Sequence, residues 1–300
     1  LTVRLRSERL SAFLRTGCPV SLEYAAGAGS GQFLRASMAR RRLNQLGGTL
    51  VAGILAGLFY FGVTDLLIWA GHPSPHHEAG YTSSLLFLIP GFPLITAGLD
   101  LARLDLTAGI SRLTYALLVV AVSSVGAWVV TVLFDLVPQT APALTLSDWN
   151  LIPLQFIASF CGVFGFASIF NTPPRIALAA ALIGAIANLG RLQLVEFDVP
   201  LQAAAPCATL LVGILAHWVS PRLRCPRIVL SVPAVLIMIP GTTAYRALVY
   251  ANQGMSLEAM TSAYETTFII AGIATGLALA RLLTDGVWAF EDQLPGSKRA

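Results

Sequence analysis

The segment that decides the fold occurs twice, as FLIPGFPL at residues 87–94 and as IMIPGTTA at residues 237–244. In both places an Ile-Pro-Gly sequence interrupts a long apolar run. Proline removes a backbone donor and glycine removes the side chain, so a helix is expected to break or kink at each site. The preceding apolar runs also match, with LVAGILA at 50–56 and LVGILA at 211–216. Two matching elements in the same order predict an internal duplication.

The composition places the chain in a membrane. Of its 300 residues 56% are hydrophobic and 11% are charged, and the mean hydropathy is +0.73. A soluble domain carries about 25% charged residues, so this chain could not cover a water-exposed surface. These values exclude a soluble enzyme, a nucleic-acid binder and a disordered protein as first interpretations. They predict an all-α, polytopic membrane protein.

Eight apolar segments have the length of about 17–25 residues that a membrane-spanning helix needs. Basic loops alternate with loops that carry no Lys or Arg, with Arg191 as the exception. The positive-inside rule therefore predicts a multi-pass inner-membrane protein with both termini in the cytoplasm. The eight segments are 49–70, 82–101, 110–134, 151–170, 176–193, 202–219, 228–249 and 265–284.

This topology runs the first Pro-Gly helix from outside to inside and the second from inside to outside. The two halves are therefore predicted to be inverted-topology repeats. Paired broken helices are typical of secondary transporters, in which the freed backbone groups hold substrate. The alternative for each motif is a simple kink in a packed helix.

The repeat also predicts the organisation of the chain. The second half has five expected spans and the first only three, so the first repeat is expected to be incomplete. We expect an arginine-rich cytoplasmic or surface-lying segment at 1–48, where the front of the first module would stand. A three-span module at 49–140 and a five-span module at 141–290 follow, and residues 291–300 form a cytoplasmic tail.

Charged residues within spans cost about 2.5–3.5 kcal/mol at a helix centre, so each is a functional candidate. Asp65, inside the first span, is the candidate for proton or cation coupling, with an interfacial anchor as the alternative. Asp100 and Arg103 follow the first Pro-Gly motif, where an ion pair in the loop is the alternative to a substrate role. Arg246, next to Tyr245, is a candidate partner for a substrate carboxylate.

No metal ion or cofactor is expected. His72, His76 and His77 lie in a loop with two prolines and lack a fixed helical spacing. The chain contains no Walker A, GxSxG or HExxH sequence, so neither ATP-driven transport nor hydrolysis is indicated. The chain is not expected to be an enzyme.

Two series of motifs stand in a recognisable order. The first is LIPGFPLI at 88–95, Asp100-Leu101 and AGISR at 108–112; the second is FNTPPR at 170–175, then Gly184, Asn188 and Arg191, then IPGTTAY at 239–245. They resemble the N-terminal and C-terminal modules of the threonine/serine exporter family over about residues 35–285. The resemblance implies an exporter driven by the proton motive force, with the two modules fused and building one pathway. Split relatives of that family are proposed to export succinate.

We therefore expect an exporter of small carboxylate-bearing metabolites such as threonine and serine, with substrate bound between the two Pro-Gly breaks. A succinate exporter, a channel and a non-transporting subunit that packs with a partner are the alternatives. The expected partners are a small-molecule substrate and the lipid bilayer, with a second copy or a complementing subunit left open, and no nucleic acid. The candidate substrate-binding residues are Pro90, Gly91, Phe92, Pro93, Asp100, Asn171, Arg175, Asn188, Pro240, Gly241, Tyr245 and Arg246.

Overall fold

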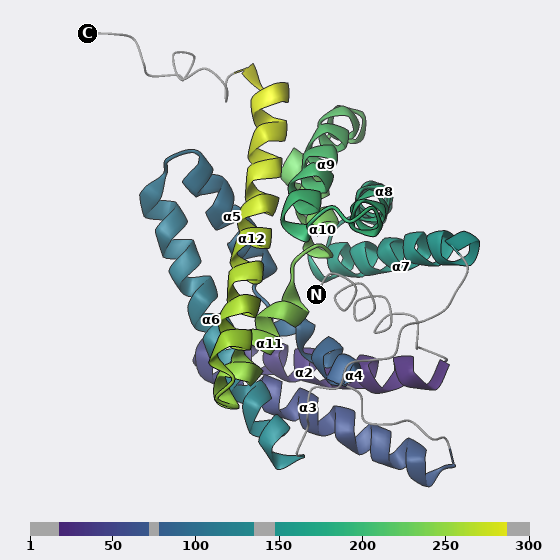
Figure 1. Cartoon of the computed structure of the whole chain (residues 1–300), viewed down its shortest axis with the longest axis vertical. Helices are drawn as coiled ribbons and strands as arrows, with labels where there is room; N and C mark the ends of the chain where they lie inside the picture. The colour runs from purple at the N-terminus through teal and green to yellow at the C-terminus, as the bar shows by residue number, and fades with distance from the viewer. Residues whose placement is uncertain (1–17, 72–77, 135–147, 287–300) are drawn as a thin grey trace. The chain divides into compact units, whose positions relative to one another are not determined.

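The computed structural model describes residues 18–71, 78–134 and 148–286 (Figure 1). Every regular element in these ranges is a helix, which confirms the all-α prediction. In chain order the elements are α2 (Cys18–Arg40), α3 (Gln45–Trp69), α4 (Glu78–Leu85), the 3-10 helix η1 (Leu86–Leu88), α5 (Gly91–Ala102), α6 (Leu106–Leu133), α7 (Asp148–Ile169), α8 (Pro174–Glu196), α9 (Leu201–Leu223), α10 (Arg227–Leu236), α11 (Gly241–Asn252) and α12 (Ser256–Thr284).

The helix lengths confirm a multi-pass membrane protein and correct the number of spans. Six of the described helices are long and apolar enough to cross a membrane: α3, α6, α7, α8, α9 and α12. The pair α10 and α11, broken at Pro240, makes a seventh if it counts as one span. The expected span at 82–101 is not one helix, because it comprises the end of α4, then η1, the break at Pro90 and the 12-residue α5. At 1.5 Å per residue, α5 reaches only about 18 Å.

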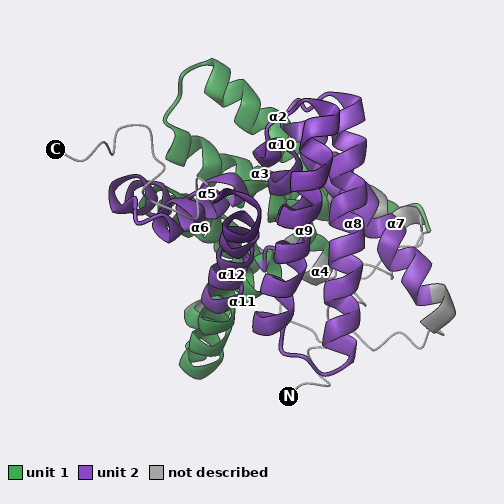
Figure 2. Ribbon diagram, turned by 90° about the horizontal axis from the view of Figure 1, so that it is seen from above, with its two compact units in different colours: residues 1–90, 114–145, 241–266 green, residues 91–113, 146–240, 267–300 purple. Residues whose placement is uncertain are grey.

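The chain divides into two compact units, and each Pro-Gly motif marks a boundary between them. Unit 1 comprises residues 1–90, 114–145 and 241–266, and unit 2 comprises the remainder (Figure 2). The chain passes from unit 1 to unit 2 between Pro90 and Gly91, and from unit 2 to unit 1 between Pro240 and Gly241. Each unit therefore contains one half of each broken helix.

In unit 1, small residues allow the helix axes to approach closely. A Cβ added to Gly27 of α2 would lie 3.0 Å from the backbone oxygen of Ala56 on α3, so a larger residue there would require the two helices to move slightly apart. Such small residues are the usual means of helix association in membranes, where lipid is as apolar as the helix surface. Helix α2 lies within the segment expected to be cytoplasmic or surface-lying, and in the structure it packs on α3 and α4.

Unit 2 is built from α7 to α10, with α5 and the second part of α12 against them. Its core is rich in alanine, and α8 and α10 touch where a Cβ on Gly184 would lie 3.0 Å from the Cα of Ala234. Helix α12 crosses α9 more closely still, because a Cβ on Gly276 would overlap the backbone oxygen of Pro206.

Helices α5 and α6 recur in the second half of the chain as α11 and α12. Helices α5 and α6 begin at Gly91 and Leu106, and α11 and α12 begin 150 positions later, at Gly241 and Ser256. The intervening turns are alike in detail. Leu104 has φ 60° and Gly254 has φ 75°, and the amide of Asp105 donates to Asp100 O at 3.0 Å as that of Met255 donates to Tyr250 O at 2.9 Å.

Helices α2 and α3 recur as α8 and α9 with a shift of 156 positions, beginning at residues 18 and 45 and again at 174 and 201. The turns between them carry a left-handed residue at the same place, Arg42 with φ 56° and Asp198 with φ 61°. This register differs by about one helical turn from the sequence match between 50–56 and 211–216. Helix α7 has no counterpart among the described residues.

The crossing of α9 and α12 yields a stability prediction. Gly276→Ala places a methyl group against a backbone oxygen that cannot rotate away, so we expect a loss of about 1–3 kcal/mol in the free energy of unfolding. Denaturation of the purified protein in detergent measures it. Gly165→Ala on α7, where an added Cβ meets nothing within 4 Å, is the matched control and should be neutral or slightly stabilising. Equal stability of the two variants would contradict the packing described.

Candidate functional site

A pocket of about 40 Å³ lies within unit 1, at the ends of the two broken helices. Leu88 and Ile89 line it just before the first Pro-Gly motif, and Gly241 lines it directly after Pro240. The middle of α6 forms the remaining wall. The full lining is Leu85, Leu86, Leu88, Ile89, Val120, Ser123, Ser124, Ala127, Gly241, Ala244 and Tyr245. One compact unit thus brings residues of both motifs to one pocket.

Hydroxyl groups supply the polar side chains of this pocket. Ser123 and Ser124 donate to the backbone oxygens one turn earlier in α6, each at 2.7 Å. Because each hydroxyl already donates its proton within α6, these two side chains can only accept a hydrogen bond from a ligand. No charged side chain is among the lining residues that the structure describes.

The ring of Tyr245 is held by its neighbours. Its hydroxyl lies 3.1 Å from Thr131 Oγ1, and Thr131 donates its own proton to Ala127 O at 2.9 Å. Tyr245 is therefore the donor to Thr131. Tyr81 also donates to Ala127 O, at 2.7 Å, and its ring meets that of Tyr245 edge-on with centroids 6.0 Å apart. These contacts fix the orientation of Tyr245 at the pocket.

The glycine of each Pro-Gly motif packs in the same way, each within its own unit. In unit 1 a Cβ on Gly241 would lie 2.6 Å from side-chain carbons of both Leu86 and Ile89. In unit 2 a Cβ on Gly91 would overlap Leu236 and lie 2.9 Å from Ile239. The contacted residues are themselves 150 positions apart, so the two contacts are equivalent under the repeat.

The backbone at the breaks is also equivalent. The amide of Ile89 donates to Leu86 O and that of Ile239 donates to Leu236 O, both at 3.2 Å. Helices α5 and α11 then begin immediately after the proline. The first amides of a helix have no partner within it and carry a partial positive charge. Gly241, the first residue of α11, lines the pocket, so the N-terminus of this helix lies at the pocket wall.

The structure distributes the other expected residues of unit 1 around this pocket. Pro90 is buried next to it, and Arg246 follows Tyr245 on α11, half-buried and outside the lining. Asp65 lies on α3, exposed and outside the pocket lining.

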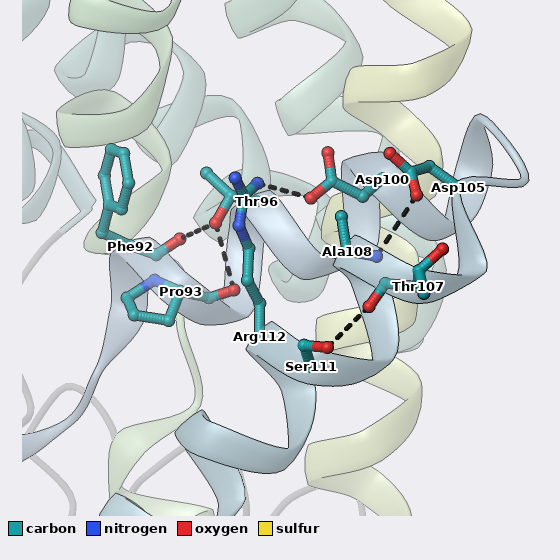
Figure 3. A network of polar contacts seen from close by, with 9 residues as sticks. All are labelled: Phe92, Pro93, Thr96, Asp100, Asp105, Thr107, Ala108, Ser111 and Arg112. Atoms are coloured by element: carbon teal, nitrogen blue, oxygen red, sulfur yellow. Dashed lines mark hydrogen bonds and ion pairs between the residues drawn. The ribbon is translucent and has the colours of Figure 1, made fainter.

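In unit 2, residues that follow the first motif make contacts of their own. Phe92 is exposed and meets Phe170 edge-on, with ring centroids 6.0 Å apart, whereas Pro93 is half-buried. Asp100 forms an ion pair with Arg112 rather than with Arg103 (Figure 3). Asp105 accepts from the amide of Ala108 at 3.2 Å and caps α6. The Asp100–Arg112 pair therefore joins α5 to α6 across their turn.

The remaining expected residues also lie in unit 2. Asn171 and Arg175 are exposed at the turn between α7 and α8, where Asn171 has φ 53°. Pro240 is buried at the end of the segment after α10. Asn188 is buried on α8, where its amide nitrogen donates to Ser159 Oγ at 2.8 Å. His72, His76 and His77 fall outside the described residues.

Several residues of the pocket, and of the contacts that hold Tyr245 beside it, were not expected from the sequence. Ser123 and Ser124 are one example, although a Ser-Ser pair within the apolar run 110–134 was a usable signal. Tyr81 and Thr131 carried no such signal, because their role depends on contacts between residues distant in the chain.

Two family descriptions match the chain side by side. Residues 5–134 match "Putative threonine/serine exporter", and residues 155–283 match "Threonine/Serine exporter, ThrE". The chain belongs to the threonine/serine exporter family. The N-terminal and C-terminal modules of this exporter family are fused here in one chain, and the family is one of transporters rather than enzymes.

A relative from Haemophilus influenzae, described as an uncharacterized protein, is 30% identical over 173 residues. The matched region covers 52% of this chain and 58% of the relative, so the chain spans little more than half the relative's length. No solved structure matches the chain.

The reciprocal glycine contacts of this exporter-family chain predict energetic coupling. Gly91→Ala should destabilise the protein because the new methyl group overlaps Leu236, and adding Leu236→Val should restore part of that stability. We expect a coupling of at least about 0.5 kcal/mol in a double-mutant cycle measured by unfolding. Pairing Gly91→Ala with Leu182→Val, an exposed residue of α8, should instead give additive changes. Additivity in both cycles would argue against the contact.

Proposed function

We propose that the protein is an inner-membrane secondary transporter that exports small amino acids of the threonine and serine type, driven by the proton motive force. The observation that supports it most is the pocket of unit 1, which is lined by residues of both Pro-Gly motifs. Membership of the exporter family supports the general activity. Family membership does not specify the substrate or the driving force, so threonine and serine as substrates and the proton motive force as the driving force are proposed here.

The chemistry of the pocket suits a zwitterion. The amides at the start of α11 can receive a carboxylate, since helix N-termini favour anions. The acceptor oxygens of Ser123 and Ser124 suit an ammonium or a hydroxyl group of the substrate. The apolar wall of Leu85, Leu88 and Ala127 excludes bulky polar side chains. A small hydroxy amino acid offers all three matching groups.

We place both termini in the cytoplasm. The supporting evidence is the alternation of basic and non-basic loops, which also gives the two repeats opposite directions through the membrane. Inverted repeats allow one half to reproduce the other's conformation on the opposite side, which is how many transporters alternate access.

Two other functions remain candidates. Succinate export would need a cationic group for the second carboxylate, and our candidate is Arg246, which follows Tyr245 on α11. A subunit that transports only together with a partner chain is the other candidate, and co-expression with that partner would then be required for efflux.

Efflux from proteoliposomes tests the proposal. Vesicles loaded with labelled threonine, serine or succinate should release threonine and serine faster when a proton gradient is imposed, and an uncoupler should abolish the increase. Release that ignores the gradient and does not saturate would indicate a channel. No release by the purified chain would favour the subunit.

Variants of the pocket sharpen the test. Gly241→Leu fills the space against Leu86 and Ile89, so efflux should fall to background, while Gly62→Leu, where an added Cβ meets nothing within 4 Å, should transport normally. Tyr245→Phe removes one hydroxyl and should raise the KM about threefold to tenfold, the value of one hydrogen bond. Undiminished efflux by Gly241→Leu would exclude this pocket as the substrate site.

Asp65 is our candidate for proton coupling, because it is a carboxylate within a spanning helix and is exposed. Asp65→Asn cannot lose a proton, so efflux driven by a pH gradient should fall to the rate without a gradient. Exchange of internal for external threonine at equal pH should continue. Glu258→Gln, at an exposed acidic residue of α12, is the control and should keep the gradient dependence. Gradient-driven efflux by Asp65→Asn equal to that of the parent protein would place the coupling elsewhere.

A further inference from the structure

Three arginines gather at one end of unit 2, although they come from segments that are far apart in the chain. Arg103 lies in the turn between α5 and α6, Arg227 is the first residue of α10, and Arg281 lies in the last turn of α12. Figure 1 shows the turn after α5, the turn before α10 and the end of α12 at the same end of this unit. The three residues are here called the arginine cluster.

Close packing of α5 against α12 brings two members of the cluster together. A Cβ on Gly98 of α5 would lie 2.5 Å from the Cβ of Ala274 on α12. From this contact α5 continues to Arg103 and α12 continues to Arg281. The guanidinium of Arg281 therefore lies within electrostatic range of Arg103, and Arg227 also lies within that range.

A hydrogen bond joins Arg227 to the end of α12. Its Nη1 atom donates to Thr284 Oγ1 at 3.0 Å, and Thr284 donates its own proton to Ala280 O at 2.7 Å. Arg227 is thus held beside the last turn of α12, which also carries Arg281. Both arginines are half-buried, so water screens their repulsion less than it would at an open surface.

This end of unit 2 carries an excess of positive charge. The segments that form it contain six arginines and three aspartates, at 100–112, 222–227 and 281–285. Asp100 pairs with Arg112, and Asp105 caps α6. Asp285 is the acidic neighbour of the cluster within the part of the chain that the structure describes. One carboxylate offsets only part of the charge of three guanidinium groups.

The fold itself does not require these charges. Gln253 stands 150 positions after Arg103, and the turns at the two places have the same backbone hydrogen bond. Thr131 of α6 stands 150 positions before Arg281 of α12. Equivalent helix ends therefore form without arginine, and an anionic partner is the remaining reason to hold three like charges together.

Exposed apolar side chains adjoin the cluster and indicate what kind of anion it fits. Each of the three arginines is followed in the chain by a large apolar residue that is exposed: Leu104 (78%), Ile228 (40%) and Leu282 (47%). A free phosphate ion would match the arginines but not these side chains. A molecule that carries an anionic group on apolar chains matches both, and the bilayer around this membrane protein supplies such molecules.

We propose that the arginine cluster binds the headgroup phosphate of an anionic phospholipid, whose acyl chains lie along the exposed apolar side chains beside it. Guanidinium groups suit this role because they bind phosphate oxygens in a bidentate manner. Basic groups between membrane helices near the bilayer surface are typical sites for such headgroups. The site is separate from the pocket of unit 1, and the proposal does not depend on export.

Native mass spectrometry of the purified full-length chain tests the proposal, because it counts the lipid molecules bound to each protein. The probes are dioleoyl phosphatidylglycerol, dioleoyl phosphatidylcholine and inorganic phosphate. The two lipids have the same acyl chains, but only the first has a net negative charge. We expect the parent protein to bind phosphatidylglycerol about tenfold or more tightly than phosphatidylcholine. Inorganic phosphate at the same concentration should not displace the bound lipid.

Variants of the cluster identify the residues responsible. Arg103→Gln and Arg281→Gln should each weaken phosphatidylglycerol binding about fivefold and leave phosphatidylcholine binding unchanged. Arg103 is exposed in a turn, so thermal unfolding of Arg103→Gln in lipid-free detergent should occur at the parent's temperature or slightly above it, because a repulsion is removed. Arg41→Gln is the matched control, since Arg41 is exposed in the turn after α2, and it should keep the parent's lipid preference.

The outcomes separate this site from general attraction and from transport. Equal affinity for the two lipids, or a preference for phosphatidylglycerol that persists in both cluster variants, would overturn the proposal. A preference that Arg41→Gln reduces as much as Arg103→Gln would also overturn it, because only the overall charge would then matter. Displacement by inorganic phosphate would assign the cluster to the free ion instead of a lipid. Since no efflux is measured, the result is independent of the proposed function.

Discussion

The two units depend on one contact, between the glycine of each Pro-Gly motif and the apolar residues that stand one and four positions before the proline of the other motif. Gly241 meets Leu86 and Ile89 in unit 1, and Gly91 meets Leu236 and Ile239 in unit 2. At either position an added Cβ would require these side chains to shift. Since the proline ends one helix segment and the glycine allows the next to begin against its neighbour, each Pro-Gly motif both breaks the helix and marks the boundary between units.

Both units contain polar side chains in an apolar interior, and they satisfy the hydrogen bonds of these side chains in different ways. Unit 1 uses hydroxyls that donate to the preceding turn of their own helix, as Ser123, Ser124 and Thr131 do, so its pocket is uncharged and offers acceptors. Unit 2 buries Arg191, whose Nε donates to the side-chain amide oxygen of Asn188. Unmatched polar groups are costly without water, so both arrangements hydrogen-bond these groups within the protein.

The sequence predicted the fold class and the duplication, because low charge and a repeated Pro-Gly motif are visible without coordinates. It did not predict the register of α3 against α9, since alanine and leucine repeats match about as well when shifted by a turn. It predicted a break or kink at Pro90, but not that the pieces on either side of the break are too short to span a membrane alone. Arg191 looked like an exception to the loop charges, and the structure gives the reason, because Arg191 lies buried within α8 beside Asn188 rather than in a loop. The sequence also did not predict that the turns at Leu104 and Gly254 are equivalent. Leucine and glycine are different residues, but both have a positive φ there.

The central claim is that the two repeats pass through the membrane in opposite directions. Leu106 and Ser256 begin the equivalent helices α6 and α12, and both are exposed. With the four native cysteines replaced, Leu106→Cys and Ser256→Cys can each be labelled with a membrane-impermeant maleimide in intact cells and after permeabilisation. The account predicts that Ser256→Cys reacts in intact cells and Leu106→Cys only after permeabilisation. Labelling of both from the same side would contradict it.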